Sequence, residues 1–183
     1  MCRKITFQEP GFNRVYFIDL LDETEDIKWK ILEWHNQDFL RGKLDKEKYS
    51  IESHKNFLEN LLYSKRKHYI AYFDGRPVGK YDFIADGQMI LDSGSYLFFE
   101  KDLMSGIGLL TRHAFLKYVF ENLKLNKIAY KVYKTNRSVI SLSKKMGGVI
   151  VAEDNDCIFF EITIDSWLEK KEKIDKLVKF MFM

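Results

Sequence analysis

The sequence has few cysteines, few prolines and no long apolar run. Cys2 and Cys157 are the only cysteines in 183 residues, so the disulfide framework of a small secreted domain is excluded and we expect a reducing compartment. No apolar stretch approaches the roughly 20 residues that span a bilayer. The first ten residues also lack the apolar segment of a secretory signal. We therefore expect a cytoplasmic protein with no membrane partner.

An excess of charge of one sign is also missing. The 30 basic residues are nearly balanced by 27 acidic ones, which leaves a net charge of +3. This value is too small to indicate a nucleic-acid partner, and it suits a basic rim around a site for a small anionic molecule. We expect no metal site. The chain is 46% hydrophobic and 15% aromatic, which is enough apolar material for the core of one domain.

The spacing of apolar residues predicts strands that alternate with helices. Strands are expected over 14–21, over 68–86 as two strands joined at "DGRP", and over 93–100, 127–133, 149–153 and 157–164. Helices are expected over 25–36, 51–62, 109–123 and 136–146. Hairpins come first and strand–helix units follow. The expected fold is therefore α/β (α+β), with a mixed, mainly antiparallel central sheet flanked by helices.

The last residues are expected to form an extra amphipathic helix. Trp167, Leu168, Ile174, Leu177, Val178 and Met181 recur at helical spacing. We expect a domain over 1–165 and a helical extension over 166–183. The apolar face of that helix could cap the core, form a homodimer contact or lie on a membrane surface, and the first two are favoured.

A pair of glycines in "DLMSGIGLL" (102–110) marks a candidate anion site. A strand that ends at Glu100, a tight loop and a helix that begins near Gly106 would present unpaired N–H groups and the positive end of a helix dipole. Gly106 and Gly108 lack the Cβ atoms that would hold a pyrophosphate away. Thr111 replaces the third glycine of the dinucleotide fingerprint, and no Gly-Lys-Ser/Thr follows, so both common phosphate motifs are excluded. A plain tight turn is the alternative.

The surroundings of this glycine pair resemble the GNAT acetyltransferase superfamily. The resemblance rests on the order of elements and on "NKIAYKVYKTNRSVISLSKKMGG", which is similar to that superfamily's closing strand, its Asn and its short helix. It implies that acetyl-CoA is the cosubstrate. It also implies that loop amides hold the pyrophosphate, those of Met104, Ser105, Gly106, Ile107, Gly108 and Leu109.

The same resemblance implies further cofactor contacts. Asn136 is the family's Asn at the strand–helix junction, where an ordinary helix N-cap is the alternative. A backbone N–H on the fourth strand, near Leu97, Phe98 or Phe99, would polarise the thioester carbonyl.

The chain departs from the family at the position of the general acid. Ser143 stands where the family often has a tyrosine that protonates the leaving coenzyme A, Leu103 stands where it has Arg or Gln, and Gly148 stands where it has an aromatic residue. Serine is not acidic in the way a phenol is. We therefore expect that Ser143 is not an essential acid, and that the thiol, with a pKa of about 8.5, leaves largely as the thiolate.

The front half resembles one subfamily more narrowly. "KILEWHNQDFLRGKL" and "YSIESHKNFLENL" are similar to nucleotide-sugar N-acetyltransferases, which acetylate the 4-amino group of a UDP-linked amino sugar on the way to pseudaminic-acid-type sugars. The resemblance extends from about residue 28 to 150. It implies that Asn36, Arg41 and His54 line the cleft for a small-molecule amine. His35 stands where the subfamily usually has Arg.

The reaction itself needs little from the protein. The amine attacks the thioester directly once both reactants are held in place. A sugar amine should be less basic than lysine, whose pKa is about 10.4, so modest base assistance suffices. Glu100, His54 or a water chain could supply it. His54 also lies on the apolar side of its helix, so a core histidine with a satisfied hydrogen bond is the alternative.

Three functions remain open from the sequence. The leading hypothesis is an acetyl-CoA-dependent N-acetyltransferase of a nucleotide-linked amino sugar. The second is a protein N-terminal acetyltransferase of the ribosomal-protein type. The third is a non-catalytic module that binds acyl-CoA or serves in an assembly.

Overall fold

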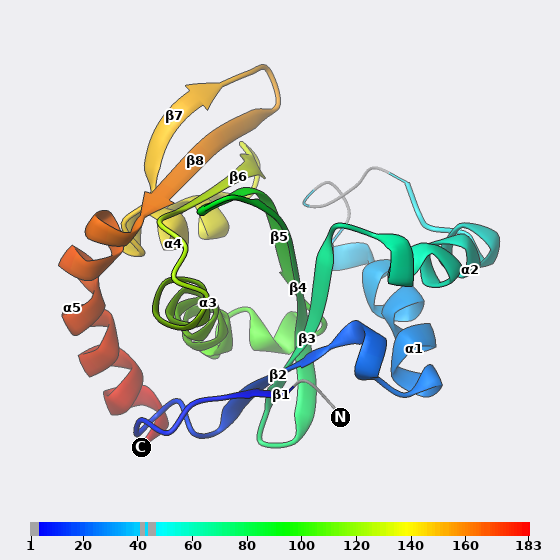
Figure 1. Cartoon of the computed structure of the whole chain (residues 1–183), viewed down its shortest axis with the longest axis horizontal. Coiled ribbons are helices and arrows are strands. Elements are labelled where there is room, and N and C mark those ends of the chain that lie inside the picture. Colours follow the sequence, from blue (N-terminus) through cyan, green and yellow to red (C-terminus); the bar gives the residue numbers. More distant parts are fainter. Residues whose placement is uncertain (1–3, 41–42, 44–46) are drawn as a thin grey trace.

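The computed structural model describes residues 4–40, 43 and 47–183 as a single eight-stranded sheet with helices on both faces (Figure 1). The strand order is β1-β2-β3-β4-β5-β6-β8-β7, and each neighbouring pair is antiparallel except β5 with β6. The strands are β1 (Lys4–Thr6), β2 (Val15–Asp19), β3 (Lys67–Phe73), β4 (Arg76–Asp86), β5 (Met89–Leu97), β6 (Lys127–Tyr133), β7 (Val149–Glu153) and β8 (Cys157–Thr163). The predicted mixed, mainly antiparallel sheet is confirmed.

The helices are α1 (Glu25–His35), α2 (Ile51–Asn60), α3 (Ile107–Lys117), α4 (Arg137–Lys145) and α5 (Ile164–Phe182). Most predicted boundaries hold to within a few residues. Strand β1 was not predicted, because three residues give no measurable periodicity and the strand exists only through its pairing with β2. Strand β5 begins four residues earlier than predicted, since its first part pairs across a short turn with the end of β4.

A bulge divides β5 into two parts. The ladder pairs Ile84 with Asp92 and Ala85 with Ile90, which leaves Leu91 without a partner on β4. The parallel pairing of β5 with β6 stops at Ile90, one residue before the bulge. A bulge bends its strand and increases the local twist. Beyond Leu91, β5 therefore stays with β4 and diverges from β6.

Two apolar cores lie on opposite faces of the sheet. The larger packs the sheet against α3, α4 and α5, and the sheet curves around α3 (Figure 1). The smaller packs Leu20, Ile70 and Phe98 against Ile31 and Trp34 of α1, so that α1 and α2 cover the other face. The helices thus cover both faces of β5, and what remains open is its edge toward β6.

Helix α5 caps the larger core. Trp167, Ile174 and Val178 are buried, and the indole N–H of Trp167 donates to Nδ1 of His113 on α3 at 3.2 Å. Nε2 of the same imidazole then donates to Asp175 on α5 at 2.8 Å. This confirms the capping interpretation, and the predicted domain boundary at residue 165 falls within α5. The homodimer contact stays a prediction. None of the helices described is both long enough and apolar enough to cross a membrane.

We predict that His113→Ala lowers the free energy of unfolding by about 2–4 kcal/mol, because it leaves a cavity and removes the partners of a buried indole and a half-buried carboxylate. Urea denaturation measures the change. Lys176→Ala is the control on the same helix, since it breaks only an exposed ion pair with Glu172 and should change stability by about 0.5 kcal/mol or less. Equal losses in both variants would contradict this account of α5.

Candidate functional site

The edge of β5 that faces β6 carries backbone groups with no strand partner on that side. The N–H of Phe98 donates to the carbonyl of Val78 on β4 at 2.9 Å. Successive residues of an antiparallel strand direct these groups to alternate sides, so Ser95 and Leu97 direct theirs away from β4. No pairing with β6 reaches them, because it ends at Ile90. An extended ligand could therefore bond to this edge as an added strand does.

The directions of the backbone N–H groups distinguish Leu97, Phe98 and Phe99, the three residues predicted to polarise a thioester carbonyl. The N–H of Phe98 already has an acceptor on β4, and its ring is fully buried in the smaller core. Phe98 is thus a structural residue. Leu97 remains as a donor on the open edge, and Phe99 follows the end of the strand.

The loop between β5 and α3 offers fewer open amides than predicted. Ser105 N–H donates to the carbonyl of Asp102 at 3.3 Å, and Ile107 N–H donates to the hydroxyl of Ser105 at 3.2 Å. The remaining predicted amides have no acceptor among the residues described. They are those of Met104, Gly106, Gly108 and Leu109. The first hydrogen bond from residue i to i−4 at this helix end runs from Leu110 to Gly106. The first turn of α3 can therefore still accept an anion.

The two glycines serve different purposes. Gly106 is the N-cap of α3 and has φ +83°, a left-handed conformation that favours glycine. A Cβ placed there would lie 2.2 Å from Cε of Met181 on α5, which is the end of a flexible side chain and can move aside, so the backbone conformation is what favours glycine. The role of Gly106 in anion binding stays a prediction. A Cβ at Gly108 would meet only Leu97 Cδ1, at 3.4 Å, so Gly108 faces β5.

A buried ion pair fixes this loop, and sequence reasoning missed it. Arg76, at the start of β4, donates from both terminal nitrogens to Asp102, at 2.8 and 3.0 Å. The Asp102 side chain is almost fully buried. A bidentate pair of this kind constrains direction as well as distance. No local pattern connects the two residues, because the contact joins positions that are 26 apart.

The remaining residues predicted on the cofactor side lie on separate elements. Asn136 is the N-cap of α4, where its side chain accepts from Val139 N–H at 3.4 Å, as the alternative interpretation held. Ser143 is buried within α4. Glu100 is exposed and lies three residues after β5 ends, with no ion pair among the residues described. Cofactor or catalytic roles for all three stay predictions.

The residues predicted for the amine cleft hold the α1–α2 layer together. Asn36 bonds through its amide to both backbone groups of Tyr49, at 2.8 and 2.9 Å. His35 stacks on the Tyr49 ring with centroids 4.1 Å apart and meets Tyr96 of β5 edge-on. Arg41 lies outside the described residues. The Asn36 side chain is therefore already engaged, and His35 is the neighbour that reaches the sheet.

His54 lies between α1 and α2. Its Nε2–H donates to the carbonyl of Lys28 at 2.9 Å, its ring packs between Trp29 and Phe57, and only 3% of the residue is exposed. This geometry favours the core-histidine interpretation over a role as base, because the donating nitrogen already has a partner within the protein.

A polar cluster on the same face was not predicted. Asp82 of β4 accepts hydrogen bonds from Arg66 and from Lys80, the latter at 2.9 Å. Arg66 also donates to Asp92 of β5. Burial raises the pKa of Asp82, but Lys80 and Arg66 outweigh it and hold that pKa below its usual value. A Cβ on Gly94 would lie 3.0 Å from this carboxylate, so the glycine leaves room for it. Alternation along β4 and β5 is the signal that could have found the cluster.

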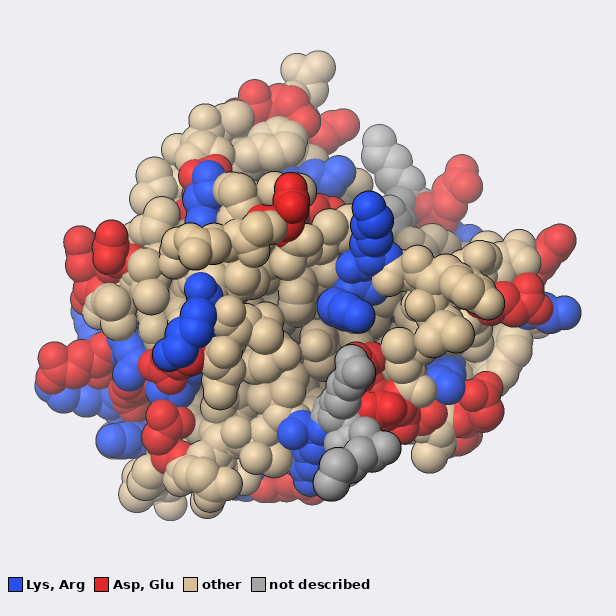
Figure 2. Space-filling view, viewed as in Figure 1, with Lys and Arg blue, Asp and Glu red and all other residues tan. Residues whose placement is uncertain are grey.

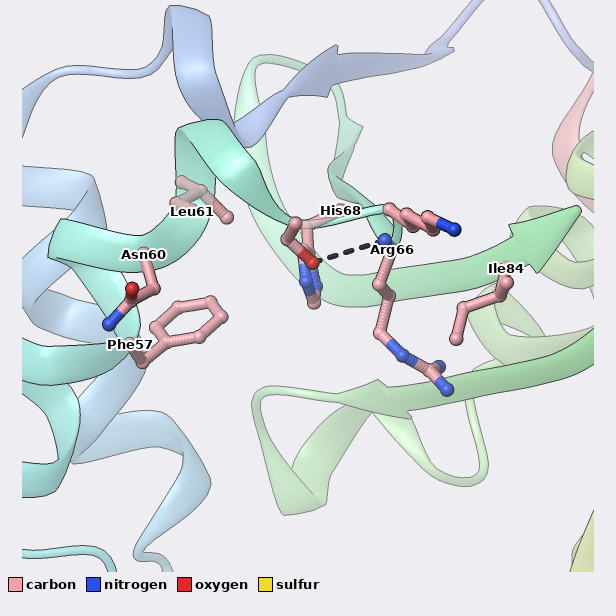
Figure 3. Close-up of a pocket in the computed structure, with 8 residues that line it drawn as sticks. Phe57, Asn60, Leu61, Arg66, His68 and Ile84 are labelled. Carbon is pink, nitrogen blue, oxygen red and sulfur yellow. Dashed lines mark hydrogen bonds between the residues drawn. The ribbon is translucent and has the colours of Figure 1, made fainter.

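A pocket of about 370 Å³ opens beside this cluster, between the end of α2 and strands β3 and β4 (Figure 3). Its walls are Phe57, Asn60, Leu61, Ser64, Lys65, Arg66, His68 and Ile84. The face of the molecule drawn in Figure 2 is largely uncharged at its centre, and both basic and acidic side chains lie around it.

His68 gives the pocket an uncharged wall. Burial lowers the pKa of His68 to about 3, and the charges of Lys80 and Arg66 act in the same direction. Its Nδ1 is buried without a hydrogen-bond partner. The imidazole is therefore neutral at physiological pH.

Comparison with known proteins gives a consistent result. No protein-family model matches the chain. The acetyltransferase PseH of Campylobacter jejuni is 28% identical over 135 residues, which are 73% of this chain and 83% of that protein. The crystal structure of the C. jejuni N-acetyltransferase PseH in complex with acetyl coenzyme A matches with a TM-score of 0.66 at 21% identity, over 82% of this chain and 99% of that one.

A third match is more distant in sequence. The crystal structure of RimL, a ribosomal-protein α-N-acetyltransferase, matches with a TM-score of 0.71 at 15% identity, over 90% of this chain and 96% of that one. Together these findings confirm the predicted GNAT fold, the resemblance to the nucleotide-sugar subfamily and the enzyme class, N-acetyltransferase. The predicted cosubstrate, acetyl-CoA, is the ligand of a homologous structure.

We predict that His54→Ala destabilises the protein without a selective effect on either substrate. The variant loses a buried hydrogen bond and aromatic packing, which together should cost about 2–4 kcal/mol. Thermal melts and steady-state kinetics with each substrate varied in turn measure the two effects. Lys55→Ala, on the exposed side of the same helix, is the control. A raised KM for the amine with an unchanged melting temperature would instead make His54 part of the cleft.

We also predict acid sensitivity that depends on His68. The pKa of His68 is lower in the folded protein than in the unfolded chain. The stability that this residue contributes is therefore fully present above about pH 6.5 and is lost as the pH falls toward 3. Between pH 7 and pH 5 the loss from this residue should be about 2 kcal/mol. Urea denaturation at both pH values measures it. His68→Phe should reduce the difference by that amount, and an unchanged difference would show that another group is responsible.

Proposed function

We propose that this chain is an acetyl-CoA-dependent N-acetyltransferase whose acceptor is the amino group of a nucleotide-linked amino sugar. The observation that carries the activity is the open edge of β5 beside the first turn of α3. The homology to PseH supports the same activity and directs the choice of acceptor.

On the cofactor side, the backbone performs most of the binding. The amides of Gly106, Gly108 and Leu109 are placed to hold the pyrophosphate at the positive end of the α3 dipole. The edge at Ser95 and Leu97 is placed to bond the amides of the pantetheine arm. The N–H of Leu97 then polarises the thioester carbonyl and stabilises the oxyanion that forms there.

On the acceptor side, the amine approaches from the α1–α2 face. This face carries Lys80, Asp82 and Tyr96, and the buried hydroxyl of Tyr96 has no hydrogen-bond partner among the residues described. The attacking nitrogen loses its proton to a weak base. Glu100 or a water chain is the better-placed group, because His54 already donates to the backbone.

The acceptor class is supported by the pocket beside this face. Its apolar walls suit a nucleobase, and Lys65 at its border suits a linked phosphate. Lys65 has no ion pair among the residues described, so its charge is available to a ligand.

The direct test is an acceptor panel. The protein is incubated with acetyl-CoA and either a UDP-linked 4-amino sugar, an N-terminal ribosomal-protein peptide or a polyamine, and released thiol is recorded. We expect turnover with the amino sugar alone. Turnover with the peptide would establish the second function, and binding of acetyl-CoA without turnover of any acceptor would establish the non-catalytic module.

We predict that Leu97→Pro lowers kcat about 100-fold or more, since proline has no N–H and one lost oxyanion donor costs about that much. The strand should tolerate the change, because this N–H takes no part in the ladder with β4. Leu97→Ala keeps the N–H and is the matched control. Similar kcat values in two folded variants would remove Leu97 from the mechanism.

A further inference from the structure

A buried arginine lies beneath the open edge of β5 without an anionic partner. Arg112 on α3 is only 8% exposed. One guanidinium nitrogen lies 3.5 Å from the Ser95 hydroxyl, and the guanidinium carbon lies 4.7 Å from the centroid of the Tyr130 ring. No carboxylate approaches it within 4.0 Å in the part of the chain that the structure describes.

Arg112 lies where strands β5 and β6 diverge. Ser95 belongs to β5 and Tyr130 to β6, in the parts of those strands that no longer pair with each other. The guanidinium therefore spans the two strands from the α3 side. On the same two strands, the hydroxyls of Ser93 and Tyr130 are buried and have no hydrogen-bond partner in the described part of the chain.

The other buried cation among the residues described, Lys117, is neutralised within the fold, since its ammonium lies 3.0 Å from Glu9. The half-buried Lys80 likewise lies 2.9 Å from Asp82. A buried charge without a counterion is costly, and a guanidinium cannot lose its proton to avoid that cost. An anion that arrives with the reaction would remove the imbalance at Arg112.

We propose that Arg112 stabilises the coenzyme A thiolate that leaves during acetyl transfer; this inference rests on the proposed function. In that step the amine nitrogen forms a bond to the thioester carbon, and the carbon–sulfur bond breaks with its electron pair going to sulfur. The proton lost by the amine goes to the base on the α1–α2 side. The negative charge on sulfur comes to lie near Arg112.

Two features favour the thiolate over the carbonyl oxygen as the partner of Arg112. The Leu97 N–H already serves the oxygen in the proposed site, and Ser143 supplies no phenol that could protonate the sulfur. Arg112 also lies on the α3 side, across the sheet from the amine, so its charge does not oppose the approach of an amine that becomes cationic.

The test compares coenzyme A with desulfo-coenzyme A, which lacks only the sulfur. Binding of each ligand to the wild type and to Arg112→Gln is measured by calorimetry between pH 6.5 and 9.5. In the wild type we expect the bound thiol to titrate at least one unit below its usual pKa of about 8.5, recorded by thiolate absorbance. Arg112→Gln should abolish that shift and weaken thiolate binding at least tenfold. Its affinity for desulfo-coenzyme A should not change.

Arg112→Lys keeps the charge and should restore part of the shift, which a purely structural role for Arg112 would not produce. Equal weakening of both ligands in Arg112→Gln, or no weakening of either, would overturn the proposal without contradicting the proposed function. A wild type that binds neither ligand would overturn the proposed function itself. If Arg112→Gln does not fold, the comparison of wild type with Arg112→Lys decides, because an unshifted thiol in the wild type refutes the proposal.

Discussion

The bulge at Leu91 is the feature on which the rest of this structure depends. Strand β5 pairs with β4 along its whole length, but its pairing with β6 stops at Ile90. Hydrogen-bonding groups of a strand in the middle of a sheet are normally used on both sides. Here the second half of β5 keeps one side open although it lies at the centre of the sheet. A strand inside a folded domain thus gains the binding capacity of an edge strand.

The neighbouring elements keep this opening in place. Arg76 and Asp102 fix the loop that follows β5, and Met181 of α5 packs against Gly106 at the start of α3. The last turn of α5 is itself held by the hydrogen bond from Arg14 to the carbonyl of Phe182 at 3.2 Å. The loop between β5 and α3 is consequently shaped by contacts from distant parts of the chain. Such preorganisation lowers the entropic cost of binding a flexible cofactor.

The two faces of the sheet also carry different charged side chains. On the α1–α2 side, Asp82 lies among Arg66 and Lys80, beside a neutral His68 and an open pocket. On the α3 side, Lys117 is paired with Glu9, and Arg112 is the buried cation with no carboxylate near it among the residues described. The open edge of β5 lies between these environments. A thioester held there would meet an amine from one side and a cation on the other, which suits a reaction that transfers charge from nitrogen to sulfur.

Local chemistry in the sequence determined the elements and the position of the glycine loop. The strand over 127–133, the N-cap at Asn136 and the glycine pair follow from periodicity and from the backbone preferences of single residues. The likeness to N-acetyltransferases was also visible there. The tertiary structure alone decided which loop amides already have acceptors, that His54 joins two helices and that no carboxylate lies near Arg112 among the residues described. Each of these depends on contacts between residues far apart in the chain, which pairing and packing create and local patterns do not encode.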